Sequence, residues 1–312
     1  MSSPVLTKDQ SAGKRWQRVK SNSSFYLLLL PAVGLLIIFH YVPIWGIAMA
    51  FTEFSYGKGI LGSPWNDFAH FKMLFNDPFF LRVFRNSIII RFYHLVFGFP
   101  MPILLALLVN EIRNVAFKKT FQTISYLPHF VSWVVLGTIV TQFFHPSRGI
   151  VASVFDFLGM EAINFLTYSP TFRGLLVITA IWQGVGWSAI VYMAALSSID
   201  TYLYESAAID GANRIQQAIY ITIPSLVPVI TILFILNMGQ MLDAGFDQIF
   251  NLYNPMVYER ADVIDTYVYR RGIMMAQFAY SAAVGLFKNV VGVTLVVVSN
   301  TIIRRYTEYG LW

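Results

Sequence analysis

Polar and aromatic side chains stand inside several long apolar runs of this 312-residue sequence. Those suited to holding a polar solute are Trp182, Gln183, Trp187, Tyr192, Asn237, Gln240, Asp243 and Lys288. Polar groups inside apolar spans tend to face the interior of a helical bundle or a water-filled cavity, because lipid satisfies none of their hydrogen bonds. Aromatic faces and groups of hydrogen bonds are also a means by which proteins hold polar solutes. We therefore predict that these residues line a pathway. For Trp182 and Trp187, anchoring at the membrane interface or packing against lipid is an open alternative.

Two basic residues lie inside apolar runs. For Lys288 we favour an ion pair with Asp243 or Asp247. The alternative is contact with an acidic solute. Arg91 lies toward one end of its run, so we expect its long side chain to reach water at the membrane surface.

A polar segment, YESAAIDGANRIQQAIYITIP from Tyr204 to Pro224, interrupts the apolar second half of the chain. Asp200 or Thr201 suits the N-cap of a helix. An apolar stripe with three- and four-residue spacing follows, formed by Ala208, Ala212, Ile215 and Ile219. Gly211 is expected to bend the helix and to let another backbone approach closely. The segment is either a pair of short helices that docks into a groove of a partner, or a hairpin that covers the end of the bundle.

Composition indicates the class of protein that positions these residues. Hydrophobic residues make up 56% of the chain and charged residues only 12%, whereas soluble domains average about 25% charged residues. This composition is typical of an all-α membrane protein that crosses the bilayer several times. There is no cysteine, which excludes disulfides and thiolate metal sites. The net charge of +6 is better explained by basic residues that set topology or touch anionic lipid than by nucleic-acid binding.

Six apolar runs are each long enough to cross a bilayer as a helix. They are residues 25–51, 87–110, 121–144, 172–196, 223–246 and 280–303. The first run is too long for the apolar core of a signal peptide, so we expect it to be retained. Basic residues near the first and last runs place the tails, residues 1–24 and 304–312, in the cytoplasm. The segment at about 198–222 falls on the same side, and the protein is expected in the cell membrane.

The sequence carries no motif for catalysis. It has no GxxxxGK[ST] phosphate loop, no HExxH and no GxSxG. Its histidines, His40, His70, His94, His129 and His145, show no close spacing of metal ligands. We therefore predict no catalytic residue, no metal site and no cofactor within this chain.

The polar segment resembles the EAA loop of binding-protein-dependent ABC importer permeases. That pattern is E-A-A, three residues, G, nine residues and I-x-L-P. Glu205, Ser206 and Ala207 occupy the triplet, with Ser206 in place of the first alanine. The glycine position is filled within Asp210-Gly211-Ala212, and Ile223 stands for the leucine before Pro224. Two other stretches, YVPIWGIAMAF and QTISYLPHFVSWVV, are similar to the LplB-like branch of carbohydrate permeases.

The resemblance implies a type I ABC importer permease fold and a role in oligosaccharide uptake, often of fragments of plant or algal polysaccharides. The implied partners are a second related permease, two cytoplasmic ATPases that bind ATP and Mg²⁺, and an extracellular solute-binding protein. The implied docking residues for an ATPase are Glu205, Ser206, Ala207, Asp210, Gly211 and Ala212. The spans that flank the EAA loop line the pathway in this family. If Lys288 meets an acidic sugar rather than a carboxylate of the chain, it would favour oligosaccharides that contain uronate. A stand-alone secondary transporter or channel is the main alternative, and a membrane glycosyltransferase or flippase is a third.

Overall fold

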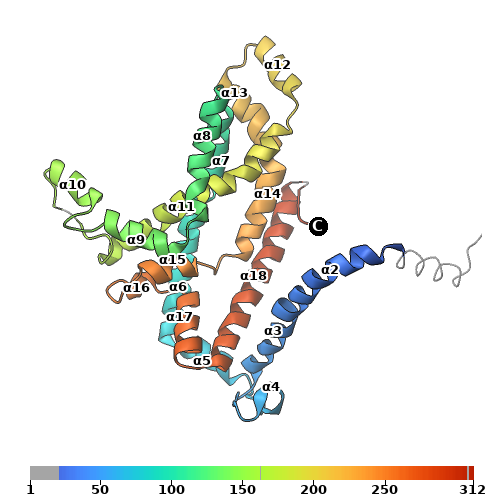
Figure 1. Ribbon diagram of the computed structural model, residues 1–312, viewed down its shortest axis with the longest axis vertical. Coiled ribbons are helices and arrows are strands. Elements are labelled where there is room, and N and C mark those ends of the chain that lie inside the picture. Colours follow the sequence, from blue (N-terminus) through green and yellow to red (C-terminus); the bar gives the residue numbers. More distant parts are fainter. Residues whose placement is uncertain (1–20, 162, 308) are drawn as a thin grey trace, which may run out of the picture.

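The computed structural model describes residues 21–161, 163–307 and 309–312, so the predicted N-terminal tail lies almost wholly outside the described residues. Regular structure in the described part is helical, apart from an isolated antiparallel bridge between Thr52 and Trp65. Figure 1 shows the helices. They are α2 (Ser23–Leu36), α3 (Val42–Ile44), α4 (Gly59–Gly62), α5 (Ala69–Asn76), α6 (Pro78–Tyr93), α7 (Pro100–Asn110), α8 (Val115–Tyr126), α9 (Trp133–Phe143), α10 (Ile150–Phe157), α11 (Ser169–Ser197), α12 (Thr201–Ile209), α13 (Arg214–Gln217), α14 (Ile223–Gly239), α15 (Phe246–Leu252), α16 (Tyr258–Ala261), α17 (Ile264–Tyr269) and α18 (Phe278–Tyr306).

Five helical stretches of the described chain are long and apolar enough to cross a membrane. They are Ser23–Phe51, Pro78–Asn110, Ser169–Ser197, Arg214–Gly239 and Phe278–Tyr306. A sixth candidate consists of two helices, Val115–Phe130 and Trp133–Phe143, joined at an angle of 104°. The prediction of an all-α membrane protein is confirmed, and the first, fourth and sixth predicted spans lie within the observed helices.

Three of these spans contain a wider π-helical turn that ends two residues before a proline. The turns are Ile37–Tyr41 before Pro43, His94–Gly98 before Pro100 and Ala218–Thr222 before Pro224. Proline has no N–H and crowds the carbonyl four residues earlier, so a regular α-helix is interrupted there. A π-turn re-forms the bonds with a different spacing and keeps the span continuous.

The third predicted span, residues 121–144, is not one continuous helix but two helices separated by a break. A 3₁₀ turn, Leu127–Phe130, contains Pro128, and Val131 and Ser132 are extended. Two extended residues in succession end the helical hydrogen bonding, so α9 leaves in a new direction. Two other boundaries were also wrong. The second span begins at Pro78 rather than at residue 87, because Asp77 caps the helix there by accepting from Phe79 N–H at 2.9 Å. The fifth span ends at Gly239 rather than at residue 246.

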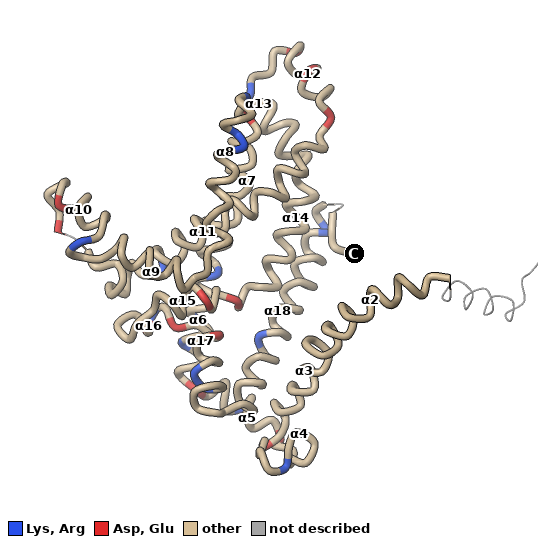
Figure 2. The backbone as a smooth tube through the Cα atoms, viewed as in Figure 1, with Lys and Arg blue, Asp and Glu red and all other residues tan. Residues whose placement is uncertain are grey.

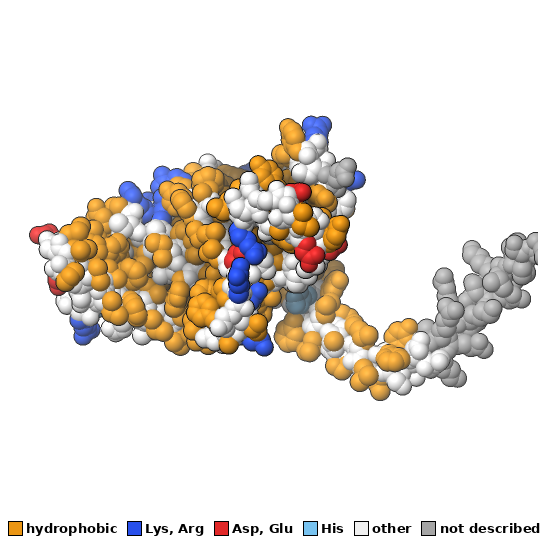
Figure 3. Space-filling model, turned by 90° about the horizontal axis from the view of Figure 1, so that it is seen from above, with side chains coloured by type: hydrophobic (Ala, Val, Ile, Leu, Met, Phe, Trp, Pro, Cys, Tyr) orange, Lys and Arg blue, Asp and Glu red, His pale blue; other side chains and the backbone are white. Residues whose placement is uncertain are grey.

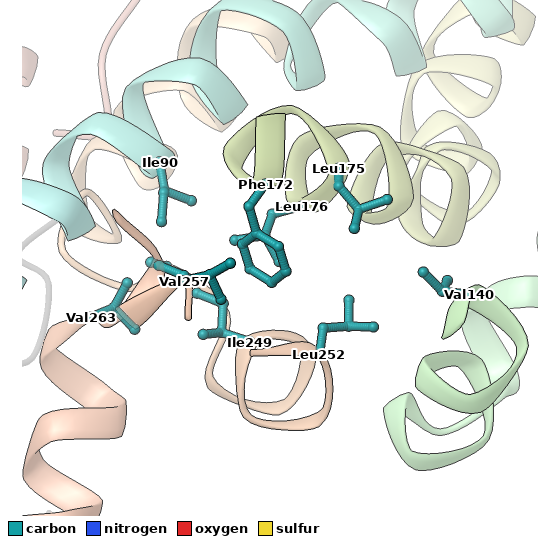
Figure 4. Packing of buried hydrophobic residues seen from close by; sticks show 11 residues of the cluster. Ile90, Val140, Phe172, Leu175, Leu176, Ile249, Leu252, Val257 and Val263 are labelled. Atoms are coloured by element: carbon teal, nitrogen blue, oxygen red, sulfur yellow. The ribbon is translucent and has the colours of Figure 1, made fainter. Parts of the chain in front are cut away.

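The buried apolar side chains join helices that are distant in the sequence. Figure 4 shows Phe172 and Leu176 of α11 facing Val257 and Ile249, with Ile90 of α6 on one side and Val140 of α9 on the other. All except Val140 are at most 1% exposed. This cluster fixes α6, α9, α11 and α15 relative to one another, which is the arrangement that encloses the cavity described below.

The chain has two distinct ends, with long apolar helices between them. In Figure 1, α12 and α13 lie at the top, and α4 and α5 lie at the bottom. The turn between α7 and α8 shares the upper end, since Arg214 lies 3.8 Å from Glu111. Figure 2 shows that α2, α14 and α18 carry few charged residues along their length. Figure 3, seen from the α12 end, shows hydrophobic side chains spread over much of the outer surface, as lipid contact requires.

Candidate functional site

A cavity of about 550 Å³ lies within the bundle, between α6, α7, α11, α14 and the break that separates α8 from α9. Its size is within the range of small-molecule sites. The lining residues that can hydrogen-bond or stack are Arg91, His94, His129, Trp133, Gln183, Trp187, Ser188, Tyr192, Asn237 and Gln248. The cavity therefore offers one formal cation, several amide and hydroxyl groups, and aromatic faces.

The polar side of the cavity centres on Arg91. Its Nη2 donates to the side-chain oxygen of Asn237 at 2.8 Å and to that of Gln240 at 3.2 Å. These bonds join α6 to the C-terminal end of α14. The expectation that Arg91 reaches water at the membrane surface is therefore wrong, because two amide oxygens hold its guanidinium at the wall of the cavity.

The aromatic side of the cavity depends on the helix break at residues 127–132. The break brings His129 onto Trp187 of α11, with ring centroids 4.7 Å apart and planes only 3° from parallel. Gln183 Nε2 donates to the backbone oxygen of His129 at 3.4 Å, which ties the break to α11 a second time. This stack presents a flat surface against which a sugar ring can pack.

The structure brings together four of the eight predicted pathway residues. Those that line the cavity are Gln183, Trp187, Tyr192 and Asn237. Gln240 lies just beyond α14 and reaches the site through its bond to Arg91. Trp182, Asp243 and Lys288 are not among the lining residues.

The sequence prediction missed six of these cavity residues, namely Arg91, His94, His129, Trp133, Ser188 and Gln248. A signal for Arg91 was present, since a cation within an apolar span faces the bundle interior by default. No comparable signal marked His129, because its position depends on the break in the third span.

Lys288 lies in a different environment from Arg91. It donates to Asp265, and its Nζ is 3.9 Å from Asp243. The expected pair with Asp243 is therefore present but long, the closer partner is Asp265 of α17, and no pair with Asp247 is found among the described residues. Asp243 and Asp265 also line a second, more open cavity of about 430 Å³.

The segment from Asp200 to Thr222 forms two short helices joined by a tight bend. Asp200 caps α12 by accepting from Tyr202 N–H at 2.9 Å. At the other end Gly211 has φ +83°, and bonds from Ala212 N–H to Ala207 and from Gly211 N–H to Ala208 complete a Schellman C-cap. A capping box of Asn213 and Gln216 starts α13. The predicted bend at Gly211 thus follows from the left-handed backbone conformation.

This hairpin projects from one end of the molecule (Figure 1). Several of its apolar side chains are exposed. The exposed apolar residues are Tyr202, Leu203, Ile209, Ile215, Ile219 and Tyr220. Of the matched triplet, Glu205 is exposed and its two small neighbours are half-buried. Tyr204 bonds to Thr222 at 3.0 Å and holds the base of the hairpin to α14. An exposed apolar surface on a projecting element marks a contact site for another molecule.

No cluster of three metal-ligating His, Asp or Glu side chains occurs within the residues that the structure describes. Comparison with known proteins gives the context for the cavity and the hairpin. Residues 98–308 match the family model for binding-protein-dependent transport system inner membrane components.

Two relatives from Bacillus subtilis (strain 168) match almost the full chain. The polygalacturonan/rhamnogalacturonan transport system permease protein YteP is 42% identical over 308 residues, which cover 99% of this chain and 96% of YteP. Protein LplB is 39% identical over 310 residues, which cover 99% and 97%. The resemblance of the sequence to the LplB-like branch is confirmed.

Solved structures agree with these relatives. A chain from the crystal structure of a bacterial ABC transporter for import of the acidic polysaccharide alginate has a TM-score of 0.86 and 40% identity, and the match covers 94% of this chain and 99% of that chain. A second crystal structure shows a bacterial alginate ABC transporter in complex with an alginate pentasaccharide-bound periplasmic protein. Its matching chain has a TM-score of 0.85 and 40% identity, with 95% and 99% covered.

These findings favour a permease subunit over a stand-alone secondary transporter or channel. The match covers the cavity-lining helices α11 and α14 as well as the projecting hairpin. The chain belongs to the family of binding-protein-dependent transport system inner membrane components.

Proposed function

We propose that this chain is the permease subunit of an ATP-driven importer for oligosaccharides from acidic polysaccharides, and that it forms half of the membrane pathway. The observation that carries the proposal is the cavity, where the His129–Trp187 stack, amide side chains and one cation line a space of about 550 Å³. The names of YteP and of the alginate transporters point to the same substrate class.

The pathway residues divide by chemistry. Trp187 and Tyr192 offer aromatic faces or a hydroxyl, while Gln183 and Asn237 offer amide hydrogen bonds. Such a lining suits sugars, which present apolar ring faces and polar edges to the same site. Gln240 acts by orienting Arg91. Trp182, Asp243 and Lys288 do not line this cavity, and we assign them no direct contact with the sugar there.

We further propose that the α12–α13 hairpin couples this chain to a separate cytoplasmic ATPase, which binds ATP and Mg²⁺. Exposed Glu205 and Asp210, the half-buried small residues Ser206, Ala207 and Ala212, and the bend at Gly211 suit insertion into a groove of that subunit. ATP-driven closure of the ATPase dimer moves the hairpin and biases the bundle between two access states. The permease itself then needs no catalytic residue or bound cofactor.

The remaining partners follow from the same assembly. A second permease completes the pathway, a second ATPase completes the motor, and an extracellular solute-binding protein delivers the sugar. The family description and the alginate complex support the last of these. Both tails and the hairpin lie in the cytoplasm, so the α4–α5 end faces outward. The apolar helices lie in the cell membrane in contact with lipid.

Uptake in cells tests the transport step and its energy source. A strain that lacks this chain is complemented with it, and uptake of labelled galacturonate and alginate oligosaccharides is measured. Arsenate, which depletes ATP, is expected to abolish the complemented uptake, whereas a protonophore under conditions that preserve ATP leaves most of it. Uptake that follows the proton gradient would instead establish a secondary transporter, and absence of any oligosaccharide uptake would overturn the substrate class.

A further inference from the structure

We propose that Arg91 is the residue of the cavity that binds a carboxylate of the sugar and gives the pathway its preference for acidic oligosaccharides. This inference rests on the proposed function, and it assigns the preference to Arg91 rather than to Lys288. Three observations support it, namely the position of Arg91, the absence of a carboxylate in contact with it and the donors that its bonds leave free.

Arg91 lies well inside its membrane span. The helix begins at Pro78, so Arg91 is 13 residues, or roughly 20 Å along the axis, from the start. Its side chain is half-buried, lines the cavity and bonds to α14. A charge at this depth is costly unless it faces water or a partner, and such residues are therefore functional candidates.

The Arg91 guanidinium has no acidic partner among the described residues: no Asp or Glu oxygen there lies within 4 Å of it. Other basic side chains in the bundle are compensated, since Arg270 pairs with Asp262, Arg271 with Asp77 and Lys288 with Asp265. Arg173 also binds neutral oxygens, those of Asn86 and the Arg260 backbone, but it does not line the cavity.

The two bonds of Arg91 orient its charge without neutralising it. Both use Nη2, and both acceptors are neutral amide oxygens, from Asn237 and Gln240. The donors on Nη1 and Nε make no other hydrogen bond within the described part of the chain. Both edges that could hold a carboxylate in bidentate geometry include Nη2, which is already bonded to the two amides. Nη1 or Nε can therefore donate a single charge-assisted hydrogen bond to a carboxylate oxygen, and a cation without a carboxylate in contact favours an anion.

Lys288 lacks these properties. Its ammonium is paired with Asp265 and lies near Asp243, so a uronate would have to displace an existing carboxylate. A uronate that enters the cavity supplies the carboxylate contact that Arg91 lacks, and its ring can pack against the aromatic wall. A neutral sugar leaves the guanidinium unpaired, so the site discriminates by charge.

The test uses the complete importer in cells and a matched pair of probes. Each probe is an acidic oligosaccharide of the series that the native chain imports, compared with the same oligosaccharide after methyl esterification of its carboxyl groups. Competition between the two forms gives an acid-over-ester preference that does not depend on expression level. Arg91→Gln is expected to lower this preference about tenfold, as loss of a charged hydrogen bond predicts. Arg91→Lys retains the charge but has fewer donors and cannot reproduce the planar contacts with Asn237 and Gln240, so it is expected to fall between the two.

Arg85→Gln is the matched control, because Arg85 is exposed on the same helix, and it is expected to keep the native preference. Should Arg91→Gln fail to accumulate, Asn237→Asp tests the same idea with Arg91 in place, since a carboxylate beside the guanidinium neutralises it and is expected to reduce the preference for acid. An unchanged preference in the folded Arg91 and Asn237 variants would overturn the role of Arg91. Absence of ATP-dependent oligosaccharide uptake with the native chain would overturn the proposed function instead, so the two failures are distinct.

Discussion

Arg91 and Lys288 are both cations within apolar spans, yet their surroundings give them different roles. Arg91 is held by two neutral amides at the wall of a cavity, and Lys288 is compensated by carboxylates. Charge inside a membrane protein is tolerated through pairing, water or ligand. The available partner, rather than the residue type, decides which of these applies at each position.

Two tryptophans of α11 allow a controlled test of the aromatic wall. Trp187 stacks on His129 and lines the cavity, whereas Trp182 does not line it, although their exposed fractions are nearly equal at 45% and 44%. We expect Trp187→Ala to raise the KM of oligosaccharide uptake several-fold, because the sugar loses a stacking surface. Trp182→Ala is expected to change KM little. Equal effects on KM in the two variants would contradict the assignment of Trp187 to the pathway.

The ion pair of Arg270 and Asp262 stabilises the segment between α14 and α18. Burial alone would lower the pKa of the Arg270 guanidinium, but the hydrogen bond and charge of Asp262 outweigh it, and the pKa rises above its ordinary value. We expect Asp262→Asn to reduce the free energy of unfolding by about 3 kcal/mol, the lower end for a broken buried pair. Unfolding of the purified protein in detergent measures this change.

Glu111→Gln is the control for Asp262→Asn. Its contact with Arg214 is longer, at 3.8 Å, and both side chains are exposed. We expect a loss below about 1 kcal/mol, as for surface pairs. Similar losses in the two variants would show that burial does not strengthen the Asp262 pair.

At the scale of elements, local backbone changes near prolines and a glycine at a helix crossing shape the bundle. Proline is accommodated by a preceding π-turn in three spans, and the third span bends where two extended residues follow the 3₁₀ turn. Glycine permits close crossing of helices: a Cβ on Gly186 of α11 would lie 2.1 Å from the Ser125 backbone oxygen of α8. Small residues commonly allow such approach between membrane helices. The bend and the crossing together place His129 against Trp187.

The helix crossing at Gly186 can be tested with a single methyl group. We expect Gly186→Ala to lower the free energy of unfolding by about 1–3 kcal/mol, because the contact is with backbone and the helices must separate. Gly174→Ala on the same helix, where an added Cβ meets nothing within 4 Å, is expected to be neutral or slightly stabilising. Thermal unfolding in detergent distinguishes them, and equal melting temperatures would refute the close-crossing argument.

On the scale of the whole molecule, a single helix, α14, connects the hairpin at one end with the cavity within the bundle. α14 begins at the base of the hairpin and carries Asn237 near its far end. The bond between Tyr204 and Thr222 fixes the hairpin to that helix. Under the proposed coupling to an ATPase, a displacement of α12 would be transmitted along α14 to the wall of the cavity that Arg91 and Asn237 share.

The coupling role predicts a defect that is confined to the ATPase contact. Ile209 on the hairpin is 88% exposed and Leu61 at the opposite end is 89% exposed, so replacement of either by Glu should leave the fold intact. We expect Ile209→Glu to reduce co-purification of the ATPase and ATP-dependent uptake at least tenfold, because a charge is buried in the contact. Leu61→Glu is expected to retain the ATPase. Full retention of the ATPase by the Ile209 variant would contradict docking through α12.

Class, number of candidate spans and the hairpin could be predicted from the sequence, because each rests on contiguous residues. The length of an apolar run indicates a membrane crossing. Asp200 and Asn213 are residue types that cap helices, and Gly211 is the type that adopts a left-handed bend. The contacts of Arg91 with residues 146 and 149 positions away, the pairing of Lys288 with Asp265 and the position of His129 were decided by tertiary structure alone. Each residue along a helix turns its side chain by about 100°, so a shift of one or two residues changes the face. Only packing between distant helices settles which polar groups meet in the cavity.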